Sequence, residues 1–170
     1  MMKIVQQEDK VLRQEAQPVA ESEFGTPELR RLVEKMSVAL AACDDGVALA
    51  APQIGVSKRL FIVSKKIFEE NPPTQDLVFV NPTITATSRT KKVLEEGCLS
   101  VRWMYGEVKR AEKITLEAYD LDGRKFVRHA SGLLAQIFQH ETDHLNGTLF
   151  IDKAKNLQEI KPEDLQKREA

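Results

Sequence analysis

The sequence has no long apolar run, few cysteines and no excess charge of either sign. None of its apolar stretches approaches the roughly 20 residues that a bilayer-spanning helix needs. The opening MMKIVQQEDK carries acids where a signal peptide would have basic and apolar blocks. Two cysteines are too few for a disulfide-stapled secreted scaffold, so Cys43 and Cys98 are each a free thiol or a ligand. We therefore expect a cytoplasmic protein without a membrane segment.

The charges balance almost completely. Lys and Arg number 25 and Asp and Glu number 26, a formal net charge of −1, so no long-range field attracts nucleic acid or an acidic membrane. Neither is expected as a partner. A chain of 170 residues with 42% hydrophobic side chains has the size and composition of one globular domain with its own core.

Local signals predict two helices. Thr26 is a candidate N-cap and Pro27 suits the first helical position, and apolar residues then recur every three or four positions until residues 44–46 end the pattern. A second helix is predicted over residues 131–146, with a glycine placed to terminate it. Residues 1–25 show no sustained periodicity and are expected to cross the surface of the fold.

Strand signals occupy most of the space between the two helices. The predicted strands are LFIV at 60–63, LVFV at 77–80, and the two arms of a hairpin within 113–130 that turns at Asp122-Gly123. These elements predict an α+β fold in which short antiparallel strands pack around the second helix, with the first helix on the outside.

The second helix contains His140, Glu141 and His144 in the pattern HExxH. Four residues turn an α-helix through roughly 400°, so both imidazoles project from one face about 6 Å apart along the axis and can reach one metal ion. They share an apolar arc with Leu133 and Ile137. The opposite, wettable side is predicted to consist of Ala135, Gln139, Thr142 and Asn146.

Burying two imidazoles and a carboxylate costs several kcal/mol unless each group is paired or ligated, and a bound dication supplies that compensation. The alternative is that the histidines are core residues bonded to backbone and that Glu141 is an ordinary surface acid. A pair at this spacing, enclosing a glutamate on the buried arc, favours the metal. His129 lies outside the pattern and is expected to be structural.

A catalytic ion usually takes three protein ligands, so the two histidines leave one position to fill. After His144 there is no further histidine, and the nearest glutamate is Glu159 in the polar C-terminal stretch. The third ligand is therefore expected upstream. Cys98 in LEEGCLS is the candidate, because the neighbouring glycine permits close backbone approach.

A third segment, GVALAAPQIG at 46–55, is rich in small residues that let another group approach the backbone. Gln53 adds an uncharged amide whose donors could face a developing oxyanion. Taken alone, such a run is equally typical of tight packing.

Together, GVALAAPQ, EEGCLS and QHETDHLNG resemble, in order and separation, the three signature motifs of the peptide deformylases. HExxH alone is shared by many metallohydrolases, whereas its combination with the two upstream segments is specific. The resemblance spans most of residues 1–150 and implies a single deformylase-like catalytic domain there. Residues 151–170 form a polar C-terminal tail outside it, either a solvated helix or a disordered stretch.

The resemblance implies metal-dependent hydrolysis of the N-formyl group from the N-terminal formylmethionine of nascent polypeptides, releasing formate. Cys98, His140 and His144 would hold one divalent ion, iron(II) in the cell, with zinc, nickel or cobalt found in preparations. The partners would be nascent polypeptides, with transient contact to the ribosome and no specific nucleic-acid sequence.

The resemblance also implies the catalytic roles. Glu141 would act as general base and then as general acid, while the side-chain amide of Gln53 and the backbone N–H of Leu99 would hold the oxyanion. The methionine pocket would be lined by Val47, Ala48, Leu94, Leu133 and Ile137. Apart from the resemblance, an ion pair between Glu96 and Arg110 is expected to support the loop of the ligand cysteine.

Two positions depart from the family pattern. Ala48 stands where most members have glycine, which is compatible with the motif only if its φ is negative. VRWMYGEV replaces the usual short Pro-Gly-type turn, and residues 102–105 either form a different wall of the substrate cleft or cover the core.

Two other functions remain open at this level. An HExxH metallopeptidase would need a third ligand downstream, which this sequence does not offer. A catalytically inactive homologue with a structural metal site would need no general base, so its function would be insensitive to Glu141→Gln.

Overall fold

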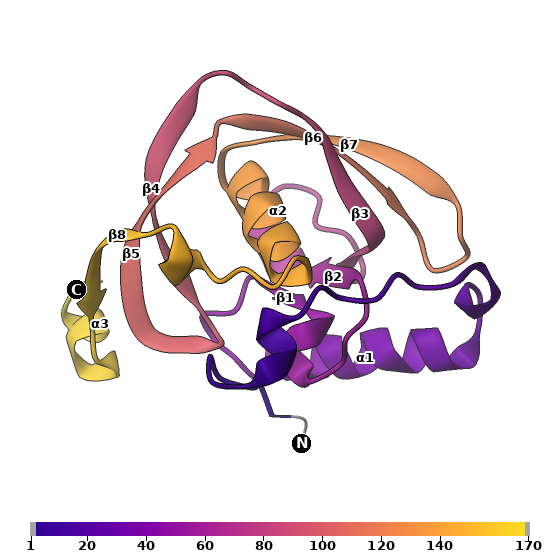
Figure 1. The fold of residues 1–170 in the computed structure, drawn as a ribbon, viewed down its shortest axis with the longest axis horizontal. Coiled ribbons are helices and arrows are strands. Elements are labelled where there is room, and N and C mark those ends of the chain that lie inside the picture. Colours follow the sequence, from indigo (N-terminus) through magenta and orange to yellow (C-terminus); the bar gives the residue numbers. More distant parts are fainter. Residues whose placement is uncertain (1–2, 169–170) are drawn as a thin grey trace.

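Two antiparallel sheets surround one helix in the computed structural model, which describes residues 3–168 (Figure 1). The α-helices are α1 (Pro27–Ala41), α2 (Gly132–Leu145) and α3 (Pro162–Arg168). The strands are β1 (Ala48–Ala50), β2 (Leu60–Val63), β3 (Leu77–Thr87), β4 (Lys91–Cys98), β5 (Val101–Ala111), β6 (Lys113–Tyr119), β7 (Lys125–Ser131) and β8 (Lys155–Glu159). The predicted α+β class is confirmed.

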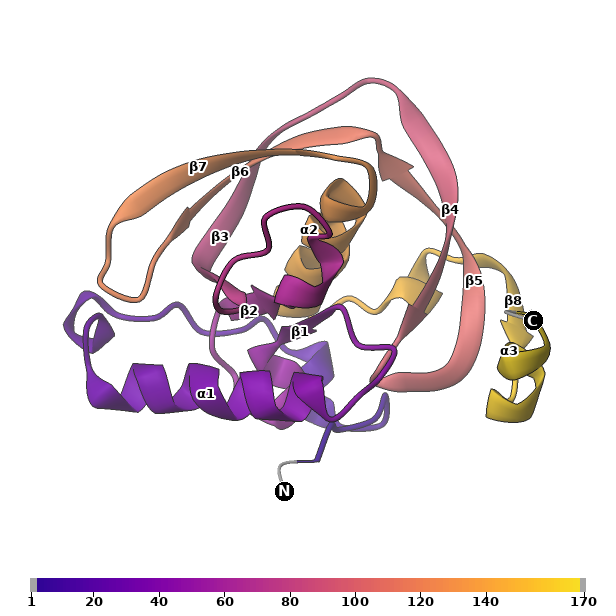
Figure 2. The same cartoon turned by 180° about the vertical axis from the view of Figure 1, so that it is seen from behind.

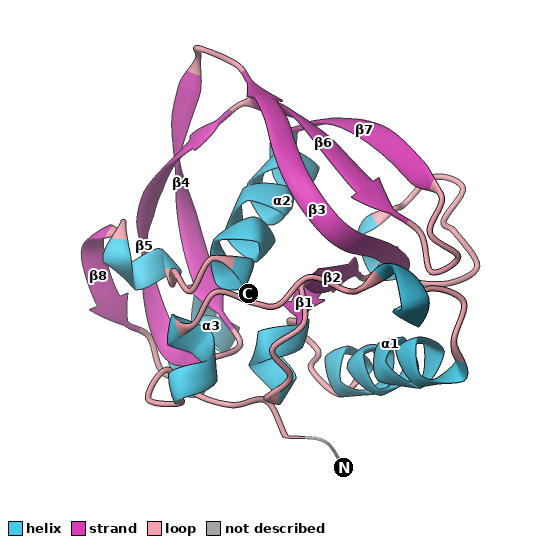
Figure 3. Cartoon of the chain, turned by 45° about the vertical axis from the view of Figure 1, so that its right-hand side comes forward, coloured by secondary structure: helices cyan, strands magenta, loops and turns pink. Residues whose placement is uncertain are grey.

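The five-stranded sheet has the order β1-β2-β3-β6-β7 and the three-stranded sheet the order β4-β5-β8. The strands curve over α2, and α1 lies along the outer side of the five-stranded sheet, as Figure 2 shows from behind. Figure 3 separates these layers by element type. The central helix and the outer helix are therefore where the sequence predicts them.

Both predicted helices form. Thr26 caps α1, its hydroxyl accepting a hydrogen bond from the N–H of Leu29. Helix α2 begins at Gly132, whose φ is +58°, and ends before Gly147, whose φ is +72°. These backbone values are common for glycine and rare for other residues, which explains where the chain enters and leaves α2.

The prediction of a wettable side on α2 is wrong. Ala135 is fully buried and Thr142 is 9% exposed, and Gln139 hydrogen-bonds to both backbone groups of Ala111 on β5. Of the four residues predicted to face solvent, only Asn146 is exposed. The reason is that this arc of α2 packs against β5 and the neighbouring protein, whereas Leu133 at the start of the helix is 54% exposed.

Aromatic packing holds α2 against the larger sheet. The ring of Phe138 lies 4.8 Å from that of Phe79 on β3, and Phe79 lies 4.9 Å from Phe61 on β2. All three side chains are almost completely buried. Such offset and edge contacts stabilise beyond the area they bury, so α2 has a defined position relative to both strands.

The strand predictions are correct where apolar residues alternate and incomplete elsewhere. Strand β2 and the β6–β7 hairpin form as predicted, whereas β3 continues past residue 80 through an irregularity at Asn81, whose φ is +47°. The β4–β5 hairpin was not predicted. Its strands carry many charged residues, and a buried position of β5 is occupied by Arg110, so no apolar alternation marks them.

The C-terminal residues are ordered elements. Strand β8 pairs with β5 and was not predicted, and the short helix α3 follows. The solvated helix considered for the tail is therefore present over Pro162–Arg168 only, where most side chains are exposed. The domain boundary at residue 150 stays a prediction. No helix within residues 3–168 is long and apolar enough to cross a membrane.

Candidate metal centre and active site

Three ligand-type side chains converge at the middle of the molecule. The Sγ atom of Cys98 and one ring nitrogen each of His140 and His144 all lie within 4.8 Å of one another. Sγ is 3.2 Å from Nε2 of His144, and the two imidazole centroids are 5.0 Å apart. These distances suit three ligands around a single cation.

The histidine ligands come from one helix, whereas the cysteine comes from a strand that is distant in the sequence. His140 and His144 share a face of α2 because they are one helical turn apart. Cys98 ends β4, where the β4–β5 register shifts so that Cys98 opposes Val101 after Gly97 has opposed Tyr105. This shift turns the last residue of β4 towards α2.

A buried carboxylate orients one of the imidazoles. Oε1 of Glu96 lies 2.9 Å from Nδ1 of His140, which leaves Nε2 to face the cluster. Arg110 donates two hydrogen bonds of 2.7 Å to Glu96 and a third of 2.7 Å to Asp143. Burial opposes the charge of Glu96, but the hydrogen bonds from Arg110 and His140 lower its pKa to about 2. A carboxylate behind a ligating histidine fixes its ring and tautomer.

The other two ionisable groups of the pattern are buried without such support. Glu141 is 4% exposed, and burial raises its pKa to about 7. Its Oε2 and the Nδ1 of His144 have no hydrogen-bond partner within residues 3–168. Burial also lowers the pKa of His144 well below its usual value, which favours the neutral imidazole that binds metals.

The donor set fits a divalent transition metal. A thiol and two imidazoles suit ions such as iron(II), cobalt, nickel and zinc better than they suit magnesium or calcium. The unpartnered Oε2 of Glu141 is buried, and a buried polar atom without a partner costs free energy. A water molecule bound to a cation at this site would give Oε2 a partner.

Gln53 is buried beside the cluster in a fixed orientation. Its Oε1 accepts a hydrogen bond of 2.8 Å from the N–H of Ala50, which points Nε2 towards Cys98 Sγ at 3.6 Å and Ser100 Oγ at 3.2 Å. Leu99 is also buried, and its carbonyl accepts a hydrogen bond from Gln6. The predicted oxyanion donors therefore lie next to the predicted thiol ligand.

A cavity of about 380 Å³ opens onto the cluster. It is lined by Cys98, His140, Glu141, Gln53 and Leu99, and by Val47, Ala48, Leu133 and Ile137 from the predicted substrate pocket. Leu94 does not line it, because this residue lies further along β4, opposite Val108. Ala48 lies in the extended strand β1 and is not among the non-glycine residues with positive φ.

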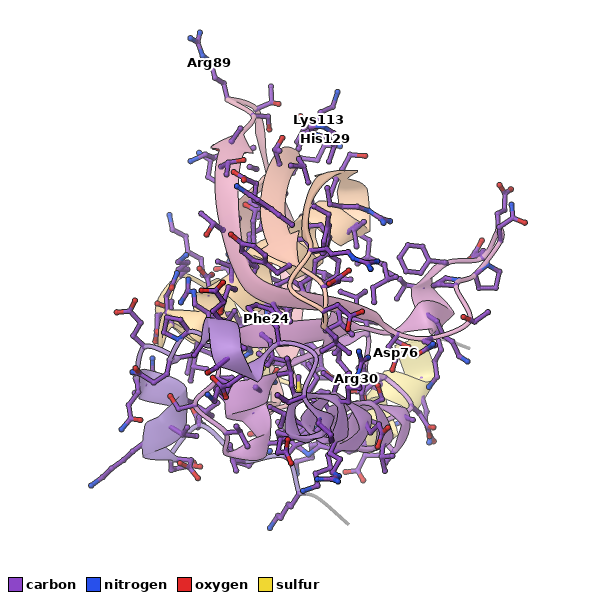
Figure 4. The ribbon with its side chains drawn as sticks, turned by 90° about the vertical axis from the view of Figure 1, so that its right-hand side faces the viewer. Phe24, Arg30, Asp76, Arg89, Lys113 and His129 are labelled. Carbon is purple, nitrogen blue, oxygen red and sulfur yellow. The ribbon has the colours of Figure 1, made fainter. Side chains whose placement is uncertain are left out.

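The remaining histidine, His129, does not line the cavity. His129 is exposed on β7, where its Nδ1 lies 3.0 Å from the hydroxyl of Thr115. Figure 4 shows it beside Lys113 at the tip of the sheet. Its expected structural role agrees with this position.

Comparison with known proteins decides the family. The model of the polypeptide deformylase family matches residues 1–159. The chain belongs to the peptide deformylase family. A peptide deformylase of Rhizobium meliloti is 44% identical over 149 residues, which are 88% of this chain and 82% of the relative. One of Desulforudis audaxviator is 39% identical over 157 residues, 92% of this chain and 96% of the relative.

Solved deformylase structures share the fold. The actinonin-bound class I type b peptide deformylase from Acinetobacter baumannii has a TM-score of 0.82 at 34% identity, covering 91% of this chain and 99% of that chain. The same protein bound to Met-Ala-Ser has a TM-score of 0.81 at 34% identity, covering 90% and 99%. The chain is accordingly an enzyme of the deformylase type, a hydrolase, and the resemblance of its three motifs is confirmed.

Several deformylase residues at this site were not predicted from the sequence. Residues 102–105 line the cavity, and Met104 also packs against a core cluster, so both alternatives stated for this segment hold in part. Asp143 joins the predicted Glu96–Arg110 pair as a third member, and Gln136 donates to the carbonyl of Glu95. Asp143 lies inside the HExxH motif, directly before His144, so its place on α2 could be read from the sequence. The contact of Gln136 depends on long-range packing.

Replacing Arg110 with leucine is expected to lower the free energy of unfolding by about 3 to 5 kcal/mol, because Glu96 would keep a buried charge without its main partner. Urea denaturation of the metal-free proteins measures the change. Arg31, exposed on α1, gives the matched control Arg31→Leu, which should change stability by about 0.5 kcal/mol or less. Equal values for the two variants would contradict a supporting role for the Glu96–Arg110 pair.

Proposed function

We propose that this enzyme removes the N-formyl group from the N-terminal formylmethionine of newly made polypeptides and releases formate. The observation that carries the proposal is the meeting of Cys98, His140 and His144 within 4.8 Å beside the buried Glu141, at a cavity. A Cys/His/His donor set with an adjacent carboxylate suits metal-assisted hydrolysis of an amide.

Cys98, His140 and His144 would hold one divalent ion, iron(II) in the cell, with zinc, nickel or cobalt as substitutes in preparations. Such an ion acts as a Lewis acid and lowers the pKa of a bound water to near neutrality. Glu96 keeps His140 in the orientation that this site needs, through the hydrogen bond at Nδ1.

Glu141 would move the proton. Its carboxylate accepts a proton from the water that attacks the formyl carbon, and it later delivers this proton to the departing amine as the C–N bond breaks. Burial raises the pKa of Glu141, which makes it a stronger proton acceptor than an exposed carboxylate. The products are formate and a free N-terminal methionine.

Gln53 and Leu99 would stabilise the tetrahedral oxyanion. The Nε2 of Gln53 is already directed at the thiol ligand, and the backbone N–H of Leu99 follows directly after that ligand. Each such preorganised donor typically contributes about 3 kcal/mol to lowering the barrier.

The methionine side chain needs an apolar slot, and four predicted residues supply one in the cavity. These residues are Val47, Ala48, Leu133 and Ile137. Val47 and Leu133 are 41% and 54% exposed, so they leave apolar surface available to a ligand. Leu94 is not part of this proposed slot.

The proposed substrate determines which molecules this enzyme would meet in the cell. Nascent formylmethionyl polypeptides place the reaction in the cytoplasm at the site of translation, and transient contact with the ribosome stays a prediction. The alternative of an HExxH metallopeptidase is not favoured, since the similar proteins are deformylases.

The test is formate release from formyl-Met-Ala-Ser by enzyme purified without oxygen and loaded with iron(II). We expect formate and Met-Ala-Ser in equal amounts, with one metal ion per chain. Acetyl-Met-Ala-Ser is the matched control substrate and should react far more slowly. Full metal loading without formate release would support the inactive homologue and overturn the proposed function.

A further inference from the structure

The N-terminal stretch of the chain reaches the turn that follows the Cys98 ligand. Leu99 and Ser100 alone connect β4 to β5, since Cys98 already pairs with Val101. Gln6 contacts this turn although 93 positions separate it from Leu99, and Figures 1 and 2 both show the indigo stretch near the start of β5. Leu99 is 8% exposed and Ser100 is fully buried. A buried turn beside the ligand cysteine is therefore held by a distant part of the sequence.

The side-chain amide of Gln6 binds backbone groups on both sides of this turn. Its Nε2 donates a hydrogen bond of 3.0 Å to the carbonyl of Leu99, and its Oε1 accepts one of 3.3 Å from the N–H of Arg102. A primary amide carries donors and an acceptor on one planar group, so a single side chain can hold two backbone positions at once. The conformation of the turn thus depends on a half-buried side chain outside it.

The peptide group that Gln6 holds also places a donor at the ligand thiol. The peptide bond between Leu99 and Ser100 is planar and trans, so its C=O and its N–H point in opposite directions. The N–H of Ser100 donates to Sγ of Cys98 at 3.4 Å. Because Gln6 fixes the C=O on one side of the peptide plane, it also fixes the N–H that faces the sulfur on the other. Hydrogen bonds to a ligand group orient that ligand and tune the site.

Val5, the residue before Gln6, holds the segment of the other proposed oxyanion donor. Its N–H donates a hydrogen bond of 2.9 Å to the carbonyl of Gln53. Ile4 packs against the apolar cluster that contains Leu99, which anchors the stretch just before both contacts. Two consecutive residues therefore bind the two segments that carry the proposed oxyanion donors, and they fix these segments relative to each other.

We propose that Gln6 is a positioning residue of this enzyme, which fixes the turn at residues 99–100 so that the Ser100 N–H faces the Cys98 thiol and the Leu99 backbone keeps its place at the oxyanion. This inference rests on the proposed function and deepens it. Gln6 does not line the cavity, so its effect passes through the turn. A preorganised donor lowers the barrier only when its direction is right, so the Gln6 contacts raise kcat and leave substrate binding nearly unchanged.

The first test is Gln6→Met, which keeps the length of the side chain and removes its amide. For formyl-Met-Ala-Ser we expect kcat to fall about tenfold, the scale of one lost hydrogen bond, while KM changes by less than about twofold. Gln6→Glu keeps an acceptor for the Arg102 N–H but has no donor for the Leu99 carbonyl, so it should be as slow as Gln6→Met. Wild-type kcat in either variant would overturn the proposal.

The matched control is Gln7→Met, the same change at the next residue. Gln7 is also half-buried, and its side chain makes no hydrogen bond within residues 3–168. This variant should keep the wild-type kcat and KM. An equal fall of kcat in Gln7→Met and Gln6→Met would show that any apolar change in the N-terminal stretch disturbs the enzyme, and it would overturn the specific role of Gln6.

Two further measurements do not depend on turnover. In the metal-free protein, NMR-detected hydrogen exchange of the Ser100 and Arg102 amides should be about tenfold faster in Gln6→Met, while the amide of the buried Ile62 on β2 keeps its wild-type rate. In the cobalt(II)-loaded protein, the absorption band of the thiolate should move to longer wavelength in Gln6→Met and stay in place in Gln7→Met, because the sulfur loses a fixed donor.

The outcomes separate this inference from the proposed function. Faster exchange at Ile62 to the same degree as at Ser100 would show a general loss of stability and would overturn the positioning role. So would a lower kcat with unchanged exchange at Ser100, since the effect would not pass through the turn. If the wild type releases no formate but Gln6→Met still changes the exchange and the absorption, the proposed function fails and the support of the Cys98 turn by Gln6 stands.

Discussion

Glu141→Gln is expected to lower the rate of formate release by about 10² to 10⁴, the usual contribution of a positioned general acid or base. Glutamine has nearly the shape of glutamate but cannot accept the proton of the attacking water. Because Glu141 is not among the three converging ligand atoms, the metal content should stay at the wild-type value. Single-turnover formate release and metal analysis on the same preparation measure both quantities.

The control for this substitution is Glu34→Gln, the same change at an exposed position of α1. It should leave formate release unchanged. A Glu141→Gln enzyme with wild-type turnover would contradict the assignment of the proton carrier. Loss of the metal in Glu141→Gln would instead show that the carboxylate helps to hold the ion.

Cys98→Ala is expected to weaken metal binding by about 100-fold or more and to abolish most of the activity. It removes one of three protein ligands, a larger loss than the 10- to 100-fold effects seen when only a supporting residue is changed. Titration of the metal-free protein with cobalt(II) measures the affinity, since thiolate coordination also gives a characteristic absorption that this variant should lack.

The second cysteine supplies the matched control. Cys43 is half-buried after α1 and packs against the apolar cluster around that helix, away from the ligand set. Cys43→Ala should keep the metal affinity, the cobalt absorption and formate release. Wild-type metal affinity in Cys98→Ala would mean that the Cys98 thiol is only a packing group.

The parts of the site that follow from local structure were predictable. The two histidines share one face because of the helical repeat. The bounds predicted for both long helices from their terminal residues lie close to the observed ones. Cys98 was predicted from the absence of a downstream ligand in the sequence, and the structure places its sulfur at the histidines. The Glu96–Arg110 pair was also predicted and is confirmed.

Other parts depend on contacts that no local pattern records. Strands β4 and β5 were not predicted, because their many charged residues show no apolar alternation and their stability depends on pairing with each other. Leu94 was expected in the pocket and lies further along the strand. Leu165 lies in a polar C-terminal stretch whose sequence pattern does not predict its structure. It lines the cavity because β8 pairs with β5 and the following helix α3 therefore lies there.

By itself, the amino-acid sequence determined the fold class, the two main helices, the ligand types and the family, because these depend on residue identity and on spacing within a helical turn or a strand. Only the tertiary structure decided that the polar arc of α2 packs against protein, that Cys98 meets the histidines at a shift of the β4–β5 register, and that residues 102–105 and 165 share one cavity. The physical reason is that each of these features depends on contacts between segments that are far apart in the chain. Their position follows from the packing of whole elements, which short-range patterns do not encode.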